Sequence, residues 1–178
     1  SSPCGLHSGY VCAPCGFSSS GGLDGVPVSG SYRVVVVGLG YVGLSMTGLL
    51  ASEHQVIGVD SDRARVGVLR SGGCPLDDPL LARTLSQVSS DVSFTSDLDS
   101  AVVGADFVVV ATPTDYDTTS GKFDTSSVDD VTARVLSVNP QALVVIKSTI
   151  PVGHTLWLRS LLGSDNVVFS PEFLREGS

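Results

Sequence analysis

The sequence predicts an α/β fold, with a doubly wound parallel sheet of about six strands and helices on both faces. Short runs of consecutive apolar, mostly β-branched residues recur along the chain, as in strands that are buried on both faces. Segments with helical patterning separate these runs, which is typical of parallel strands joined by helical crossovers. A glycine-rich turn follows the first run, at 34–37.

The predicted elements alternate along the chain. Strands are expected at 34–37, 55–59, 92–95, 106–111, 142–147 and 166–169. Helices are expected at 44–50, 61–70, 79–88, 98–103, 125–138 and 152–162, the fifth with Thr125 or Ser126 as its N-cap. The polar segment 112–124 is predicted to be a loop. Ligands of such sheets bind beyond the carboxyl ends of the strands, so the residues after each strand are the candidates for a site.

Length and charge limit the classes of protein to consider. The 178 residues suffice for one domain with a hydrophobic core. The formal net charge of −8 disfavours nucleic acid and anionic membrane surfaces as partners. No apolar run approaches the roughly 20 residues that span a bilayer, so no membrane partner is expected. Without a signal peptide or a disulfide framework, a cytoplasmic location is expected.

The first 31 residues differ from the rest of the chain. Residues 1–31 are rich in Gly, Ser and Pro, and we predict a flexible, disordered leader followed by a domain at 32–178. Cys12 and Cys15 form a CxxC pair that could bind zinc or act as a redox pair. Incidental cysteines in a flexible leader are the favoured interpretation, and no metal site is predicted.

Gly38, Gly40 and Gly43 form the pattern G-x-G-x-x-G between a predicted strand and a predicted helix. The first glycine permits a tight turn, the second lets the backbone approach a pyrophosphate, and the third allows close packing of helix and strand. The helix N-terminus then offers N–H groups to the phosphates. The pattern predicts a dinucleotide site. A tight turn without a ligand is the alternative, although one glycine would be enough for it.

Asp60 ends the second predicted strand, 20 residues after Gly40. A carboxylate at this position accepts hydrogen bonds from the adenosine ribose hydroxyls and repels a 2′-phosphate, which favours NAD over NADP. Arg63 and Arg65 lie close and weaken this preference. The alternative role for Asp60 is an acid in the N-cap region of the next helix.

Hydroxyl side chains follow two later strands. Thr112 and Thr114 come after one strand, and Thr149 comes after the next. Each could contact a ribose or the nicotinamide. From position alone, an ordinary turn is favoured for the first two and an N-cap role for Thr149. Glu172 and Glu176 would share one helix face and suit proton transfer, although a solvated helix face explains their spacing better.

Taken together, five segments resemble the UDP-glucose 6-dehydrogenases of the UDP-glucose/GDP-mannose dehydrogenase family. They are VGLGYVGLS at 37–45, ATPTDYD at 111–117, FDTSSV at 123–128, VIKSTIPVGHT at 145–155 and FSPEFLREG at 169–177. They appear in family order and span 32–178 almost continuously. The resemblance implies a Rossmann-type NAD-binding domain. It also implies an oxidoreductase, homo-oligomeric at full length, that converts UDP-glucose to UDP-glucuronate with two NAD.

The resemblance also implies roles for individual residues. The NAD contacts would be Gly38, Gly40, Tyr41, Val42, Gly43, Asp60, Arg65, Thr114, Thr149 and Glu176. The substrate contacts would be Glu172, Phe173, Leu174, Arg175 and Glu176, and the catalytic residues Thr149, Glu172 and Glu176. Arg65 stands where the family often has a lysine. The nucleophilic cysteine of the family belongs to a motif that none of the four cysteines fits.

Two further expectations follow from the missing cysteine. The chain is expected to be the amino-terminal part of such an enzyme, without its central and C-terminal substrate domains. Alone it should bind NAD weakly, if at all, and not turn over UDP-glucose. Two alternatives stay open: a sibling enzyme acting on GDP-mannose or a UDP-N-acetyl sugar, and a non-catalytic NAD-binding or assembly module.

Overall fold

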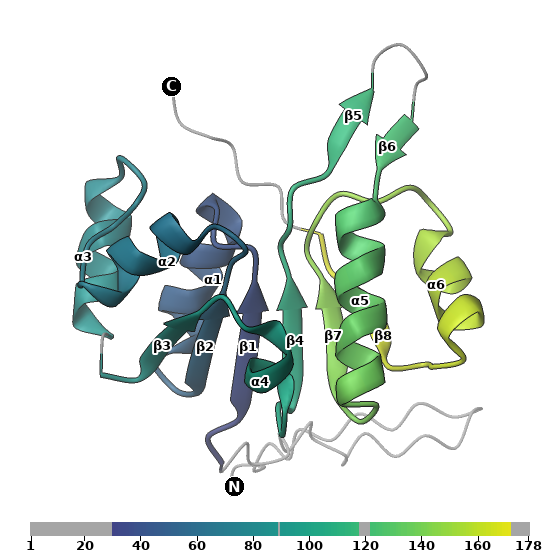
Figure 1. The fold of residues 1–178 in the computed structure, drawn as a ribbon, viewed down its shortest axis with the longest axis horizontal. Helices are drawn as coiled ribbons and strands as arrows, with labels where there is room; N and C mark the ends of the chain where they lie inside the picture. Colours follow the sequence, from purple (N-terminus) through teal and green to yellow (C-terminus); the bar gives the residue numbers. More distant parts are fainter. Residues whose placement is uncertain (1–29, 89, 118–121, 172–178) are drawn as a thin grey trace, which may run out of the picture. The chain divides into compact units, whose positions relative to one another are not determined.

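The computed structural model of the chain describes residues 30–88, 90–117 and 122–171. Contacts divide the chain between Gly30 and Ser31, and the unit that begins at Ser31 contains all the helices and strands given below. Within it, a six-stranded parallel sheet is flanked by helices, so the predicted α/β fold class is confirmed (Figure 1).

The sheet has the strand order β3-β2-β1-β4-β7-β8. Its strands are β1 (Arg33–Val37), β2 (Gln55–Val59), β3 (Val92–Thr95), β4 (Phe107–Val110), β7 (Leu143–Ile146) and β8 (Val167–Phe169). All five neighbouring pairs are parallel. The chain builds outward from β1 in one direction and then returns to build outward from β4 in the other. The boundary between β1 and β4 is therefore the switch point beside which doubly wound sheets bind ligands.

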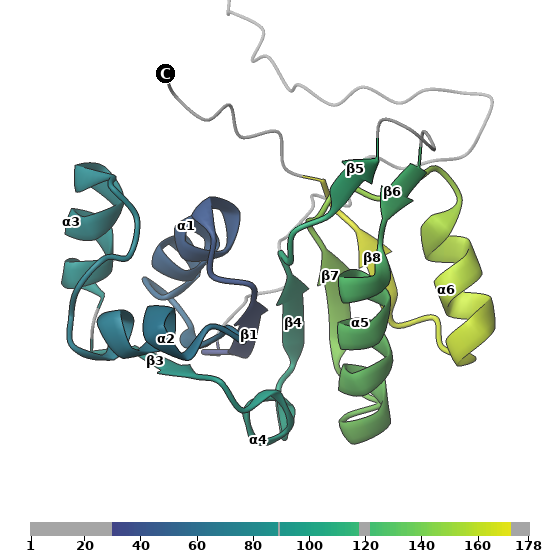
Figure 2. The ribbon, with the colours of Figure 1, turned by 45° about the horizontal axis from the view of Figure 1, so that its top comes forward.

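The helices form two layers, one on each face of the sheet (Figure 2). One layer contains α1 (Tyr41–Leu50), α2 (Arg63–Arg70) and α3 (Pro79–Gln87), and the other contains α4 (Leu98–Val102), α5 (Ser126–Val138) and α6 (His154–Leu162). Alternate residues of β1 serve the two layers. Val34 and Val36 belong to the buried cluster with α1, while Val35 and Val37 belong to the cluster with α5. This division explains why the strand is apolar at every position.

One element of the fold was not predicted. The segment 112–124, predicted to be a loop, contains an antiparallel pair, β5 (Asp115–Asp117) and β6 (Lys122–Asp124). The pair forms a separate two-stranded sheet beyond the carboxyl end of β4 (Figure 1). Because it stands apart from the main sheet, its polar sequence lacks the apolar run that marks the other strands.

Some helix starts also differ from the prediction, and one predicted N-cap lacks its capping hydrogen bond. Helix α2 begins at Arg63, because the Asp62 carboxylate accepts hydrogen bonds from the first turn and caps it. Helix α6 begins at His154, after Gly153 adopts a left-handed conformation with φ of 86°. Thr125 is the N-cap of α5 by position, but its hydroxyl bonds the Asp129 carboxylate instead of a backbone N–H.

Candidate functional site

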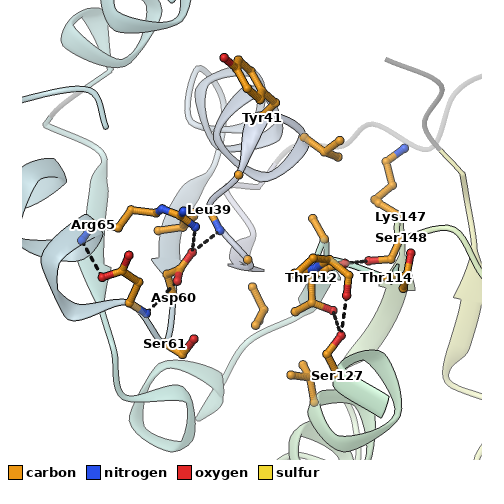
Figure 3. A pocket seen from close by; sticks show the side chains of 18 of the residues that line it. Leu39, Tyr41, Asp60, Ser61, Arg65, Thr112, Thr114, Ser127, Lys147 and Ser148 are labelled. Carbon is orange, nitrogen blue, oxygen red and sulfur yellow. Dashed lines mark hydrogen bonds and ion pairs between the residues drawn. The ribbon is translucent and has the colours of Figure 1, made fainter. Parts of the chain in front are cut away.

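A cavity of about 780 Å³ lies at the carboxyl ends of β1, β2, β4 and β7 (Figure 3). Its walls come from the turn 37–42, from the start of the segment after β2, from 111–114 and α5, and from the end of β7. This volume lies within the range of small-molecule and cofactor sites. The location is the one that the switch point of the sheet predicts.

Two glycines of the turn are required by close backbone contacts. Gly38 has φ of 91°, and a Cβ atom there would lie 2.5 Å from the carbonyl oxygen of Ala111. A Cβ atom on Gly43 would lie 1.8 Å from the carbonyl oxygen of Gly38. Both distances are far shorter than any van der Waals contact. The first and third glycines of the motif therefore let β1, the turn and α1 pack together.

Gly40 differs, because a Cβ atom there would meet nothing within 4 Å. Gly40 is also the N-cap of α1, and no side chain caps that helix end by a hydrogen bond. The first turn of α1 contains no acidic residue. The helix N-terminus thus presents backbone donors and a positive dipole end to open space, which fits a pyrophosphate at the turn.

Asp60 follows β2 and is only 7% exposed. Its Oδ2 atom accepts hydrogen bonds from the Leu39 N–H at 2.8 Å and from the Arg65 guanidinium at 3.0 Å, and its Oδ1 atom accepts from the Asp62 N–H at 2.9 Å. Burial raises the pKa of Asp60, but these donors outweigh burial and hold the pKa below its ordinary value. Asp60 is an ionised acceptor at the cavity wall, and it also bonds the N–H of Asp62, the residue that caps α2.

The opposite wall contains a network of neutral hydroxyl groups. The Ser127 hydroxyl donates to the Pro113 carbonyl at 2.8 Å and shares a 3.1 Å hydrogen bond with the Thr112 hydroxyl. The Ser148 hydroxyl donates to the Thr112 carbonyl at 2.6 Å. These bonds join the end of β4, the first turn of α5 and the end of β7 around the cavity (Figure 3).

Thr149 is exposed and lines the cavity beside Lys147 and Ser148. The favoured prediction for it, an N-cap, is wrong, because the N-cap of α6 is Gly153 and the helix begins at His154, five residues after Thr149. The intervening Ile150 is buried and anchors the segment to the core. Thr149 is therefore free of a capping role and available to a ligand.

The cavity gathers most of the predicted cofactor residues from distant parts of the sequence. Those that line it are Gly38, Gly40, Tyr41, Val42, Asp60, Arg65, Thr114 and Thr149. Gly43 does not line the cavity; it packs behind the turn, against the carbonyl group of Gly38. The predicted substrate and catalytic residues Glu172, Phe173, Leu174, Arg175 and Glu176 lie outside the described residues, and so do Cys12 and Cys15.

Three residues of α5 that line the cavity were not predicted from the sequence: Ser127, Asp130 and Val131. The helical spacing of the buried residues of α5 is the pattern that could have identified these three residues. Val128 and Thr132 are fully buried, so Ser127 and Val131, each one residue earlier, flank the buried face of the helix, and Asp130 lies outside it. That end of α5 follows β6 and reaches the carboxyl edge of the sheet, where the cavity lies.

The described part of the chain contains neither a cluster of metal ligands nor a membrane-spanning helix. Residues 30–88, 90–117 and 122–171 bring together no group of three or more His, Cys, Asp or Glu side chains that could hold a metal ion. Over the same residues, no helix has the length and apolar character needed to cross a membrane.

The fold and the site define a dinucleotide-binding domain of the Rossmann type, with a glycine turn, a helix N-terminus and an acid at the end of β2. Residues 32–178 match the NAD binding domain of the UDP-glucose/GDP-mannose dehydrogenase family, and the chain belongs to this family. NAD is accordingly its cofactor. The open space at Gly40, the uncapped N-terminus of α1 and the Asp60 carboxylate all fit this dinucleotide.

Known proteins similar to the chain carry related names. The UDP-glucose 6-dehydrogenase of Campylobacter jejuni is 39% identical over 148 residues, which are 82% of this chain and 38% of the relative. The enzyme of the same name from Streptococcus pneumoniae is 38% identical over 146 residues, 81% of this chain and 36% of the relative. The chain thus spans little more than a third of the length of these relatives.

Solved structures show the same relationship. A UDP-glucose dehydrogenase from Pyrobaculum islandicum superimposes with a TM-score of 0.75 at 31% identity, over 85% of this chain and 38% of that one. A GDP-mannose dehydrogenase from Pseudomonas aeruginosa gives a TM-score of 0.71 at 27% identity, over 81% of this chain and 37% of that one.

Proposed function

We propose that this chain is the NAD-binding part of a UDP-glucose 6-dehydrogenase, which oxidises UDP-glucose to UDP-glucuronate with two NAD. One observation carries the NAD part of the proposal: the glycine turn, the N-terminus of α1 and Asp60 all border one cavity. The names of the relatives that are 38–39% identical support the UDP-glucose part. The full-length protein is proposed to be a cytoplasmic homo-oligomer.

Each wall of the cavity has a separate task in this proposal. The turn from Gly38 to Gly40 and the first N–H groups of α1 bind the pyrophosphate. Asp60 and Arg65 bind the adenosine ribose. Tyr41, Val42, Thr114 and Thr149 complete the cofactor contacts. NAD, when bound, supplies the hydride acceptor for the oxidation of the sugar alcohol, and the protein holds it at the edge of the sheet where a substrate can approach.

The catalytic assignments rest on the resemblance to the family. Thr149 is proposed to position a water near the reacting carbon, and its exposed hydroxyl at the cavity supports this role. Glu176 is proposed to contact NAD and handle protons, and Glu172 to act near the reaction centre. The residues from Glu172 to Glu176 are proposed to contact the substrate.

The NAD proposal is tested by titrating ¹⁵N-labelled protein with NAD⁺ and recording ¹H–¹⁵N spectra, which detect millimolar binding. The amide signals of Gly38, Gly40 and Leu39 should shift, and those on the far edge of the sheet, such as Val92 and Ser93 of β3, should not. A folded protein without shifts at the turn in 10 mM NAD⁺, roughly ten times the weakest affinity expected of a useful site, would contradict the proposal.

The chain alone is proposed to be inactive toward UDP-glucose, because the nucleophilic cysteine of the family belongs to a later segment. Steady NADH production from the purified 178-residue chain with UDP-glucose would overturn this expectation. The full-length enzyme is proposed to need the nucleophilic cysteine motif that the resemblance to the family implies. Sequencing the gene beyond the codon for Ser178 tests that directly.

A sibling activity is the second candidate, and the structural similarity to a GDP-mannose dehydrogenase favours keeping it. The motifs ATPTDYD and KSTIPVG are closer to the UDP-glucose branch. Comparing kcat/KM of the full-length protein for UDP-glucose, GDP-mannose and a UDP-N-acetyl sugar distinguishes these enzymes. A non-catalytic module with a zinc site in the leader would instead show stoichiometric zinc that depends on Cys12 and Cys15.

A further inference from the structure

The segment between β7 and α6 carries Thr149 along the cavity and is held at its two ends. At the first end, the Ser148 hydroxyl donates to the Thr112 carbonyl at 2.6 Å, and Ile150 is buried in the core. Residues 151–153, which follow, are all exposed. Apolar packing is not directional, so the contact of Ile150 with the core does not by itself fix the orientation of Thr149.

The far end of the segment is held by a pair of side chains from two helices. His154, the first residue of α6, has its Nε2 atom 2.6 Å from Oδ1 of Asp129 in the first turn of α5. An ionised carboxylate only accepts hydrogen bonds, so the imidazole N–H is the donor. The His154 and Asp129 side chains are 11% and 24% exposed, and α5 and α6 lie side by side (Figure 2). The segment is thus tied to α5, the helix whose first turns also border the cavity.

The Asp129 carboxylate is itself held from its other side. Its Oδ2 atom accepts a hydrogen bond from the Thr125 hydroxyl at 3.1 Å. Thr125 is the N-cap residue of α5, but its hydroxyl orients this carboxylate and makes no capping bond. The His154 ring packs beside the ring of Trp157, with the centroids 5.1 Å apart. Because both carboxylate oxygens are bonded and the imidazole is packed, the pair is a fixed contact and differs from a mobile surface ion pair.

The backbone around the pair does not provide the same anchor. The His154 N–H donates to the Pro151 carbonyl at 3.1 Å, which closes a turn within the segment. Gly153, the N-cap of α6, has a left-handed conformation and no side chain that could bond a neighbour. Further along α6, the Arg159 guanidinium donates to the Val167 carbonyl at 2.7 Å and so holds the helix to β8. His154 is therefore the side chain that attaches the start of α6 to α5.

We propose that His154 is a positioning residue of the cofactor site: its hydrogen bond to Asp129 fixes the segment 149–153 and thereby holds the Thr149 hydroxyl at the cavity. This inference rests on the proposed function, in which Thr149 contacts NAD and positions a water. His154 and Asp129 do not line the cavity, so they act through Thr149 and not by touching the cofactor. Without the pair, the segment can rotate about Ile150, and the Thr149 hydroxyl loses its fixed orientation.

The experiment titrates the ¹⁵N-labelled chain with NAD⁺ and records ¹H–¹⁵N spectra before and during the titration. The variants are His154→Ala, His154→Gln, Thr149→Ala and the double variant Thr149→Ala/His154→Ala. Glutamine restores an uncharged N–H donor for Asp129. Arg159→Ala is the matched control, because it removes a hydrogen bond of the same helix outside the segment. If His154→Ala does not fold, His154→Leu replaces it, since leucine keeps apolar volume beside Trp157 without a donor.

His154→Ala should shift the amide signals of Thr149 and Ile150 in the free protein. It should also weaken NAD⁺ binding about 3- to 10-fold, the range expected for one lost hydrogen bond, and Thr149→Ala should weaken binding by a similar factor. The double variant should bind no more than about twofold more weakly than Thr149→Ala, because the two residues act as one unit. His154→Gln and Arg159→Ala should bind NAD⁺ within about twofold of the wild type, and Arg159→Ala should leave the Thr149 signal in place.

The outcomes separate this inference from the proposed function. If the folded wild-type chain does not bind NAD⁺, the proposed function is wrong and the inference falls with it. If the wild type binds NAD⁺ and His154→Ala binds it equally well, the proposed function stands and His154 is not a positioning residue. The inference is also overturned if the effects of His154→Ala and Thr149→Ala multiply in the double variant, because His154 then acts by another route. The same holds if Arg159→Ala weakens binding as much, because lost stability alone then explains the effect.

Discussion

The two walls of the cofactor cavity are built by different physical means. The wall between β1 and β2 relies on backbone contacts and a charge: Gly38 and Gly43 have no room for a side chain, and Asp60 accepts three hydrogen bonds. The wall between β4 and β7 relies on neutral hydroxyl groups, Ser127 and Ser148, that bond the segment after β4.

The difference predicts how each wall tolerates change. A side chain added at a glycine that touches backbone cannot move aside, because the backbone atoms around it are fixed. Removing a buried carboxylate leaves its hydrogen-bond donors without an acceptor. A neutral hydroxyl bond contributes only about 1 kcal/mol, and its partners are near the surface. Substitutions in the first wall should therefore affect folding and binding strongly, whereas those in the second should act mildly.

The largest effect is expected from Gly43→Ala. The added Cβ would lie 1.8 Å from the Gly38 carbonyl oxygen, so α1 and the turn must separate. We expect the free energy of unfolding to fall by about 3 kcal/mol or more, as measured by urea denaturation. A decrease in the free energy of unfolding of less than about 1 kcal/mol would show that the turn and α1 can move apart at little cost, so that this wall is not rigid.

Gly40→Ala is the matched control, because it adds the same methyl group where nothing lies within 4 Å. Its free energy of unfolding should stay within about 1 kcal/mol of the wild type. NAD binding should nevertheless weaken at least about tenfold, since the methyl group occupies the space of the pyrophosphate. Unchanged NAD binding in Gly40→Ala would place the pyrophosphate elsewhere.

The next effect in size concerns the charge of Asp60. The pKa of Asp60 is lower in the folded state than its ordinary value, so the ionised carboxylate stabilises the fold above pH of about 4, and this stabilisation is lost as the pH falls. Asp60→Asn should therefore cost about 1–3 kcal/mol at pH 7. The difference between wild type and variant should shrink as the pH is lowered below about 4.

Urea denaturation at pH 7, 5 and 3 measures this dependence. Glu53→Gln is the control, because Glu53 is an exposed acid after α1 and should change the free energy of unfolding by less than about 0.5 kcal/mol. A difference for Asp60→Asn that persists unchanged to pH 3 would mean that the amide fails for steric reasons instead of for lack of charge.

The two walls also differ in how far the sequence predicts them. Gly38, Gly40, Gly43 and Asp60 lie within 23 consecutive residues, so their spacing, together with the predicted strand and helix around them, predicts a dinucleotide site. The same holds for the buried strands, because residues such as Val34 to Val37 of β1 alternate between the two helix layers.

The second wall was not predictable in the same way. Ser127 and Thr112 are 15 residues apart, and Ser148 and Thr112 are 36 apart. Such pairs depend on tertiary structure, and an isolated serine or threonine fits a turn or a cap equally well. Thr149 is an example of a wrong prediction from local sequence. Local propensity favours an N-cap there, but the N-cap is the left-handed Gly153, and the helix begins after it.

A smaller effect is expected from Ser127→Ala in the second wall. The variant loses the bonds to the Pro113 carbonyl and the Thr112 hydroxyl, so the free energy of unfolding should fall by about 1–1.5 kcal/mol. Ser137→Ala is the control on the same helix, because its exposed hydroxyl bonds only the preceding turn at Arg134, and it should change stability by less than about 0.5 kcal/mol. If Ser127→Ala and Ser137→Ala lowered the stability equally in thermal unfolding, the hydroxyl bonds of the cavity wall would contribute no more than a surface hydroxyl does.

The smallest effect, and one of opposite sign, is expected at Thr132 of α5. Its side chain is fully buried, and its hydroxyl has no hydrogen-bond partner among the residues that the structure describes. Thr132→Val replaces the hydroxyl with a methyl group of similar size, so removing the desolvated polar group should raise the free energy of unfolding by about 0.5–1 kcal/mol. Thr132→Ser, which keeps the hydroxyl and loses the methyl group, should instead destabilise the protein. If Thr132→Val also destabilises it, the hydroxyl is bonded in solution, and the hydroxyl network of the second wall extends deeper into α5 than Ser127.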